Sequence, residues 1–75
     1  KLLNDPEPEV RRIVAERALP DDAARLLNDV DWTVRFAAVG RAPRDAVRSL
    51  LDDPEPEVRR LAWERLARTD ISKES

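Results

Sequence analysis

The chain has 75 residues, of which 40% are charged, yet its formal net charge at pH 7 is only −2. Such a balance gives no bulk attraction to nucleic acid or to a membrane surface, and no apolar run approaches the ~20 residues of a membrane span. Cysteine and histidine are both absent, which excludes disulfides and the usual protein ligands of zinc and iron–sulfur centres. Composition therefore predicts no metal site, no cofactor and no membrane association. The lack of cysteine is compatible with the cytoplasm, where we place the chain.

A ten-residue motif occurs three times with a period of 24 residues, beginning at Leu2, Leu26 and Leu50. A fixed period in this range indicates a solenoid, in which each unit buries its apolar face only by stacking on its neighbours. Three units are about the minimum for a stable stack. Because the chain lacks methionine and opens inside a unit, we interpret residues 1–75 as a single repeat domain taken from a longer array.

Long and short helices alternate along the predicted stack, at about 8–18, 20–27, 32–42, 44–51 and 56–68. The long helices have apolar residues at i, i+3, i+4, i+7 spacing. Pro8 and Pro56 suit the first helical position, Asp31 is a good N-cap, and Pro20 and Pro43 are stop signals. The short segments leave room for only about two turns, so we expect mixed α and 3₁₀ geometry there. No segment alternates with period two, so we expect no sheet.

The run Leu-Leu-x-Asp-Pro-x-Pro-x-Val-Arg resembles the leucine-rich repeat variant family, a bacterial solenoid of 24-residue repeats that alternate α- and 3₁₀-helices. The resemblance covers residues 2 to about 68. It implies an all-α, right-handed α-solenoid of three 24-residue repeats, each a long α-helix plus a short α/3₁₀-helix. The pattern is also similar to HEAT-like repeats, but their units are longer. Some members of the first family carry a cysteine-ligated iron–sulfur module, and nothing of it carries over to a chain without cysteine.

Two columns of charged residues recur with the repeat, one of aspartate and one of arginine: Asp5, Asp29, Asp53 and Arg11, Arg35, Arg59. We interpret them as a ladder of Asp–Arg hydrogen bonds, within or between units, that fixes the register of the stack. The alternative is anion binding by the arginines. A further column, Arg17, Arg41 and Arg65, lies near the apolar face, so its guanidinium groups must reach a carboxylate or the carbonyls at a helix end.

The candidate partner-binding residues lie on the long helices: Arg12, Phe36, Gly40, Arg60 and Trp63. An exposed Phe36 between two arginines is a plausible anchor because aromatic and arginine side chains dominate binding hot spots. Gly40 lies one turn after Phe36, where the other units have glutamate, and a glycine within a helix costs about 1 kcal/mol. A solvated face with a stray aromatic, and a glycine tolerated near a helix end, is the alternative interpretation.

The two tryptophans have different predicted roles. Trp32 stands where the other units have Pro8 and Pro56, and we expect it to pack between them. Trp63 is either a cap over the last unit or a contact residue. The family resemblance implies that the long helices line the concave side, which would place Arg12, Phe36 and Arg60 in a groove.

The function predicted from these features is a non-catalytic scaffold that binds a protein or peptide on its long-helix surface. The sequence offers no nucleophile–base pair and no phosphate loop, so we expect no enzyme activity. Two alternatives stay open: a nucleic-acid-binding HEAT-like solenoid, against which the matched acidic and basic residues argue, and an architectural spacer within a larger protein. The first and last units also leave open an end-to-end stacking of separate copies.

Overall fold

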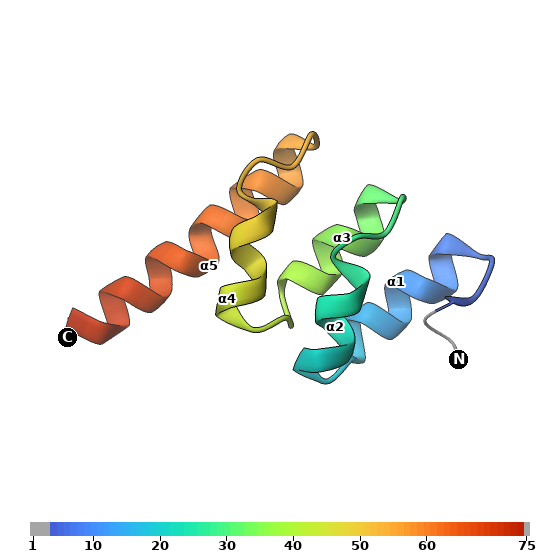
Figure 1. Ribbon diagram of the computed structural model, residues 1–75, viewed down its shortest axis with the longest axis horizontal. Helices are drawn as coiled ribbons and strands as arrows, with labels where there is room; N and C mark the ends of the chain where they lie inside the picture. The colour runs from blue at the N-terminus through green and yellow to red at the C-terminus, as the bar shows by residue number, and fades with distance from the viewer. Residues whose placement is uncertain (1–3, 75) are drawn as a thin grey trace.

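The computed structural model is an all-helical stack, and it describes residues 4–74, with side chains described as far as residue 68 (Figure 1). The long helices are α1 (Pro8–Arg17), α3 (Trp32–Val39) and α5 (Pro56–Glu74). The short helices are α2 (Pro20–Leu26) and α4 (Arg44–Val47), and α4 continues into the 3₁₀-helix η2 (Arg48–Leu50). Every regular element in residues 4–74 is a helix, so the fold is an α-solenoid.

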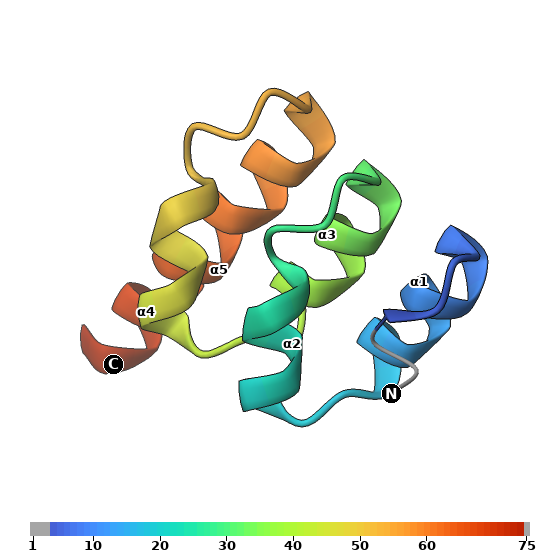
Figure 2. The same ribbon diagram turned by 45° about the vertical axis from the view of Figure 1, so that its right-hand side comes forward.

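The helices form two layers (Figures 1 and 2). Helices α1, α3 and α5 lie side by side in one layer, with α1 contacting α3 and α3 contacting α5. The short helices α2 and α4 cover one face of this layer. The long helices begin at Pro8, Trp32 and Pro56, each 24 residues after the last, and the short segments begin at Pro20 and Arg44 with the same spacing. The period of the sequence is therefore the period of the structure.

Local signals explain where the helices begin. Pro8 and Pro20 occupy the first turns of α1 and α2, where the missing N–H of proline leaves no hydrogen bond unmade. Asp31 caps α3, and its carboxylate accepts a hydrogen bond from the amide of Thr33 at 2.9 Å. The N-cap predicted at Asp31 is thus confirmed.

Two long helices end elsewhere than the sequence predicts. Helix α3 stops at Val39 rather than residue 42, because Gly40 serves as its C-cap and Pro43 follows three residues later. Helix α5 runs to Glu74 rather than residue 68, because no proline or glycine follows Pro56 to stop it. Among the short segments, Pro20–Leu26 is α-helical throughout and only Arg44–Leu50 mixes α and 3₁₀ turns.

The core is built from small side chains at equivalent positions. Ala38 and Ala62 are completely buried, and so are Val34 and Val58 in the neighbouring column. The largest fully buried side chains are valines, which lets adjacent long helices approach closely. Leu26, Leu27 and Leu50, the paired leucines of the motif, complete the core beneath the short-helix layer. The stack therefore presents regularly spaced long helices, and any site must lie on their surface.

Candidate binding groove

One face of α3 departs from the repeat pattern at three successive turns. The residues at the equivalent positions of the first repeat are Pro8, Arg12 and Glu16, and those of the third are Pro56, Arg60 and Glu64. The middle repeat has Trp32, Phe36 and Gly40 instead. Residues four apart line one face of a helix, so these replacements create a single apolar strip.

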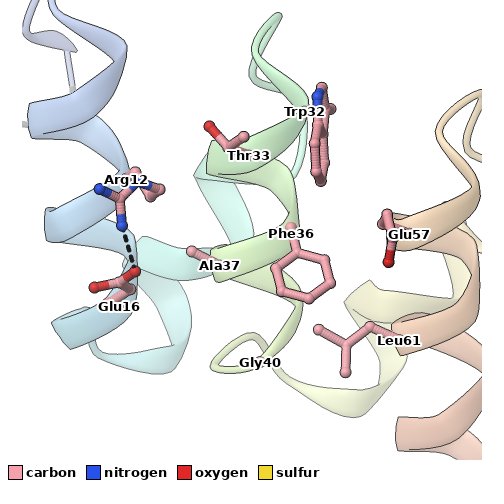
Figure 3. Close-up of a pocket in the computed structure, with 9 residues that line it drawn as sticks. All are labelled: Arg12, Glu16, Trp32, Thr33, Phe36, Ala37, Gly40, Glu57 and Leu61. Carbon is pink, nitrogen blue, oxygen red and sulfur yellow. Dashed lines mark hydrogen bonds and ion pairs between the residues drawn. The ribbon is translucent and has the colours of Figure 1, made fainter.

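The strip borders a surface groove with a volume of about 460 Å³ (Figure 3). Trp32 and Phe36 form its aromatic side, with ring centroids 6.3 Å apart and an interplanar angle of 81°, an edge-to-face contact. Leu61 of α5 faces Phe36 across the groove, and Glu57 lies one turn before Leu61. Trp32 and Phe36 each keep 38% of their surface exposed. The groove thus offers partly exposed aromatic surface, with the Glu57 carboxylate on its α5 side.

Gly40 is the last residue of the strip, and it does not lie in the middle of a helix. It is the C-cap of α3, with φ −69° and ψ −17°, a conformation open to any L-residue. A Cβ added there would meet the carbonyl oxygen of Ala37 at 3.4 Å, an ordinary contact. The cost of a mid-helix glycine therefore does not apply, which corrects that part of the sequence interpretation. The absence of a side chain at Gly40 leaves this end of the groove open.

Arg12 and Glu16 line the groove on its α1 side. The Arg12 guanidinium lies 2.8 Å from the Glu16 carboxylate, an exposed i, i+4 ion pair (Figure 3). Arg12 therefore has a carboxylate partner on its own helix, at the α1 side of the groove. In the middle repeat, Phe36 and Gly40 occupy the positions of this ion pair.

The Asp and Arg columns lie between the long helices, at their first turns. Arg11 donates two hydrogen bonds to the Asp29 carboxylate, at 2.7 and 3.0 Å, and one to the carbonyl oxygen of Asp5 at 2.6 Å. Arg35 repeats the pattern with the Asp53 carboxylate, at 2.8 and 3.1 Å, and the carbonyl of Asp29 at 2.7 Å. Each arginine thus joins the aspartate of its own unit to the aspartate of the next.

Each aspartate of this ladder also binds its own loop. Asp5, Asp29 and Asp53 accept a hydrogen bond from the amide two residues later, each at 2.9 Å. The side chains of Asp29 and Asp53 are 8% and 4% exposed. The ladder residues therefore hold the loops and the register, and the bidentate geometry leaves little of Arg11 and Arg35 for an external anion.

The ladder changes the acidity of its members. Burial is the strongest single influence on Asp29 and opposes ionisation, but the hydrogen bonds from Arg11 and from the Asp31 amide outweigh it, so the pKa of Asp29 is lowered. The hydrogen bond with Asp29 in turn raises the pKa of Arg11. Hydrogen bonds from the Thr33 hydroxyl and amide lower the pKa of Asp31. All three groups are charged at neutral pH.

Comparison with known proteins agrees with this architecture. Residues 32–55 match the family model described as leucine rich repeat variant. A solved structure described as "a leucine-rich repeat variant with a novel repetitive protein structural motif" is similar to 85% of this chain, at 58% sequence identity and a TM-score of 0.78. These repeats belong to the leucine-rich repeat variant family. The chain spans 27% of the length of that solved structure, and no curated protein matches it.

Two of the predicted binding residues of this leucine-rich repeat variant lie away from the groove. Arg60 and Trp63 are on α5, and neither lines the groove around Phe36. In Figure 3 Arg12 lies on the α3 side of α1 and Phe36 on the α5 side of α3, so each leans toward the following unit. Trp63 is 59% exposed, whereas its equivalents Ala15 and Val39 are fully buried.

Arginines of a further column reach backwards along the stack. Arg41 donates to the carbonyl oxygen of Ala18 at 3.2 Å. Arg65 donates to the carbonyl oxygens of Val39 and Ala42, at 2.7 and 2.6 Å. The sequence allowed two kinds of partner for this column, a carboxylate or the carbonyls at a helix end. Arg41 and Arg65 both donate to carbonyl oxygens at or just after the end of the preceding long helix.

Sequence reasoning missed Trp32 and Leu61 as groove residues. We expect Trp32 to pack between Pro8 and Pro56; in the structure it contacts Phe36 and borders the groove. The signal was present, because an aromatic pair at i, i+4 is set to touch on one helix face. Leu61 has core-like helical spacing, and only the position of α5 against α3 reveals that it also faces the groove.

Other kinds of site find no support in the described part of the leucine-rich repeat variant. Residues 4–68 hold no group of three or more acidic side chains placed to bind a metal ion. None of the helices searched among the described residues is both long and apolar enough to cross a membrane.

Proposed function

We propose that this leucine-rich repeat variant is a non-catalytic scaffold whose groove between α3 and α5 binds a protein or peptide partner. One observation carries the proposal. The middle repeat replaces an exposed proline and the Arg–Glu ion-pair positions with Trp32, Phe36 and Gly40, all on one face. Changes confined to one surface of one repeat are unnecessary for stacking, since the flanking repeats stack without them.

The chemistry of the groove supports an apolar anchor on the partner. A volume of about 460 Å³ lies within the range of ligand pockets and accommodates one or two side chains. Partly exposed Trp32 and Phe36 are of the residue classes that dominate binding hot spots. Glu57 is exposed at the edge of the groove, so a basic residue next to the apolar anchor of the partner is favoured.

The nucleic-acid alternative has less support. Arg11 and Arg35 are engaged in the ladder, and Arg12 is paired with Glu16. A surface for phosphate needs unpaired cations along one face. The spacer alternative requires no groove at all, so it predicts that groove substitutions change no binding.

The test compares the wild type with the double variant Phe36→Arg, Gly40→Glu. This variant introduces at the middle repeat the ion-pair residues that the first repeat already carries as Arg12 and Glu16, so the stack should keep its fold. A displayed library of random ten-residue peptides is selected on the wild type, and binders are then titrated against both proteins. We expect peptides that share an apolar residue beside Lys or Arg, and a loss of affinity of about 10- to 100-fold in the variant.

Circular dichroism of the double variant serves as the folding control, and Glu57→Gln serves as the matched control for charge preference. Glu57→Gln should weaken peptides with a basic residue more than peptides without one. Selected peptides that bind the wild type and the double variant equally would overturn the proposal, and so would a library that yields no binder to the wild type.

A further inference from the structure

The groove between α3 and α5 has a flat aromatic surface on its α3 side. Trp32 and Phe36 lie on α3, which has a long-helix neighbour on either side, so their exposure of 38% each is a property of the groove. In Figure 3 the indole of Trp32 is seen edge-on, with one ring face turned toward α5. The Phe36 ring stands at 81° to the indole, and Leu61 faces Phe36 from α5. A side chain that enters the groove therefore meets an indole face above an apolar floor.

The α5 side of the groove carries a carboxylate that the chain itself does not use. Glu57 is exposed, and its carboxylate makes no hydrogen bond or ion pair within residues 4–68. Glu16, the other acidic residue of the groove, lies on the α1 side and is paired with Arg12. A cation bound between α3 and α5 would thus have the Trp32 indole on one side and the Glu57 carboxylate on the other.

We propose that the basic residue of the bound peptide is an arginine, whose guanidinium lies between the Trp32 indole and the Glu57 carboxylate. This inference rests on the proposed function, since it assumes that a peptide occupies the groove. A cation over an aromatic face is attracted by the ring quadrupole, and tryptophan provides the strongest attraction. The apolar residue next to the arginine then packs on Phe36 and Leu61.

The geometry favours arginine over lysine. The guanidinium group is planar and weakly hydrated, so it can stack on the indole while its N–H groups, which lie in its plane, donate to a carboxylate. The ammonium group of lysine is a compact, strongly hydrated charge without a flat face to stack. The structure therefore predicts a groove that distinguishes the two basic residues and does not merely attract positive charge.

The probe is the tightest peptide selected from the displayed library, synthesised with arginine, lysine or citrulline at its basic position. Citrulline has the shape of arginine without its charge. In titrations against the wild type, lysine should weaken binding about three- to tenfold, and citrulline should weaken it further. Glu57→Gln should reduce the difference between arginine and citrulline, because the carboxylate that pairs with the charge is gone.

Trp32→Pro isolates the contribution of the indole. Proline occupies the equivalent position in the flanking repeats. The residue before it already has a suitable backbone, since Asp31 has φ −91° and ψ 123°, close to the −88° and 117° of Glu7 before Pro8. The variant should therefore keep its fold, which circular dichroism checks, and should lose most of the preference for arginine over lysine.

The outcomes separate this inference from the proposed function. Equal affinity of the arginine and lysine peptides for the wild type would overturn the inference, as would selected peptides without a basic residue or an arginine preference that survives Trp32→Pro. In each of these cases a loss of binding in Phe36→Arg, Gly40→Glu would still support the groove as a peptide site. A library that yields no binder would overturn both.

Discussion

At the scale of single residues, charged side chains in this chain work mainly as structural connectors. The Asp53 carboxylate is 4% exposed and accepts two hydrogen bonds from Arg35 and one from the amide of Glu55. A carboxylate buried in this way is stabilising only while its partners are present. Asp52, its neighbour in sequence, is exposed, which makes the two residues a natural comparison.

Replacing Asp53 with alanine should destabilise the chain by about 2–4 kcal/mol, because the Arg35 guanidinium and the Glu55 amide lose their acceptor. A core of this size supplies only about 3–5 kcal/mol, so Asp53→Ala should lose most of the stability of the chain and unfold at a much lower urea concentration than the wild type. Asp53→Asn keeps one acceptor for the Glu55 amide, so its stability should fall between that of the wild type and that of Asp53→Ala. Urea denaturation followed by circular dichroism measures all three proteins. The control Asp52→Ala should stay within about 0.5 kcal/mol of wild type; equal losses at both positions would contradict the ladder's role.

Gly40 gives the opposite expectation. Its φ of −69° suits any L-residue, and a Cβ would have an ordinary 3.4 Å contact. Gly40→Ala should therefore stabilise the chain by about 0.4–1 kcal/mol through a less flexible unfolded state. Thermal denaturation of the wild type and Gly40→Ala measures this difference in stability. A lower unfolding midpoint in Gly40→Ala would mean that the C-cap of α3 requires glycine.

At the scale of the elements, the sequence predicted the number and order of the helices better than it predicted which side chains meet on their surfaces. The repeated motif predicted an all-α solenoid, and the structure and the related solved structure show one. Boundaries differed where a single residue decides them: Gly40 ends α3 early, and the lack of a helix breaker lengthens α5. The sequence predicted only part of the groove, because Trp32 and Phe36 come from one repeat and Leu61 comes from the next. Contacts between units depend on how far helices lean, which period and composition do not specify.

The junction between α1 and α3 should respond to acid. The lowered pKa of Asp29 and of Asp31 means that folding favours their ionised forms. The stability they contribute is fully present above the unfolded value of about 3.9 and is lost as pH falls from there through the lower folded values. The urea midpoint should therefore fall below about pH 4.

Measuring the urea midpoint from neutral to acidic pH in two variants isolates this junction. Asp29→Asn removes one of the titrating groups, so its stability should depend less on pH in the acid range than that of the wild type. Asp52→Asn, at an exposed position, should follow the wild type. An unchanged acid dependence in Asp29→Asn would show that other carboxylates govern acid unfolding.

At the scale of the whole molecule, the chain is a row of units rather than a globule, with principal extents of 42 × 24 × 15 Å. Helix α3 contacts both α1 and α5, whereas each outer long helix has one long-helix neighbour. In such a row, stability is a sum of unit terms and nearest-neighbour terms. The middle repeat, which also carries the groove, is thus held from both sides.

This arrangement predicts an uneven response of amide hydrogen exchange to core substitutions. In the wild type the amides of α3 should exchange more slowly than those of α1, because opening α3 breaks two interfaces and opening α1 breaks one. Val34→Ala removes a fully buried side chain of α3 and should speed exchange in α1, α3 and α5 together. Val14→Ala removes a partly exposed side chain of α1 and should speed exchange there while α5 keeps its protection. Equal acceleration of α5 by both substitutions would mean that the stack opens as one cooperative unit, and that the groove of α3 gains no protection from its central position.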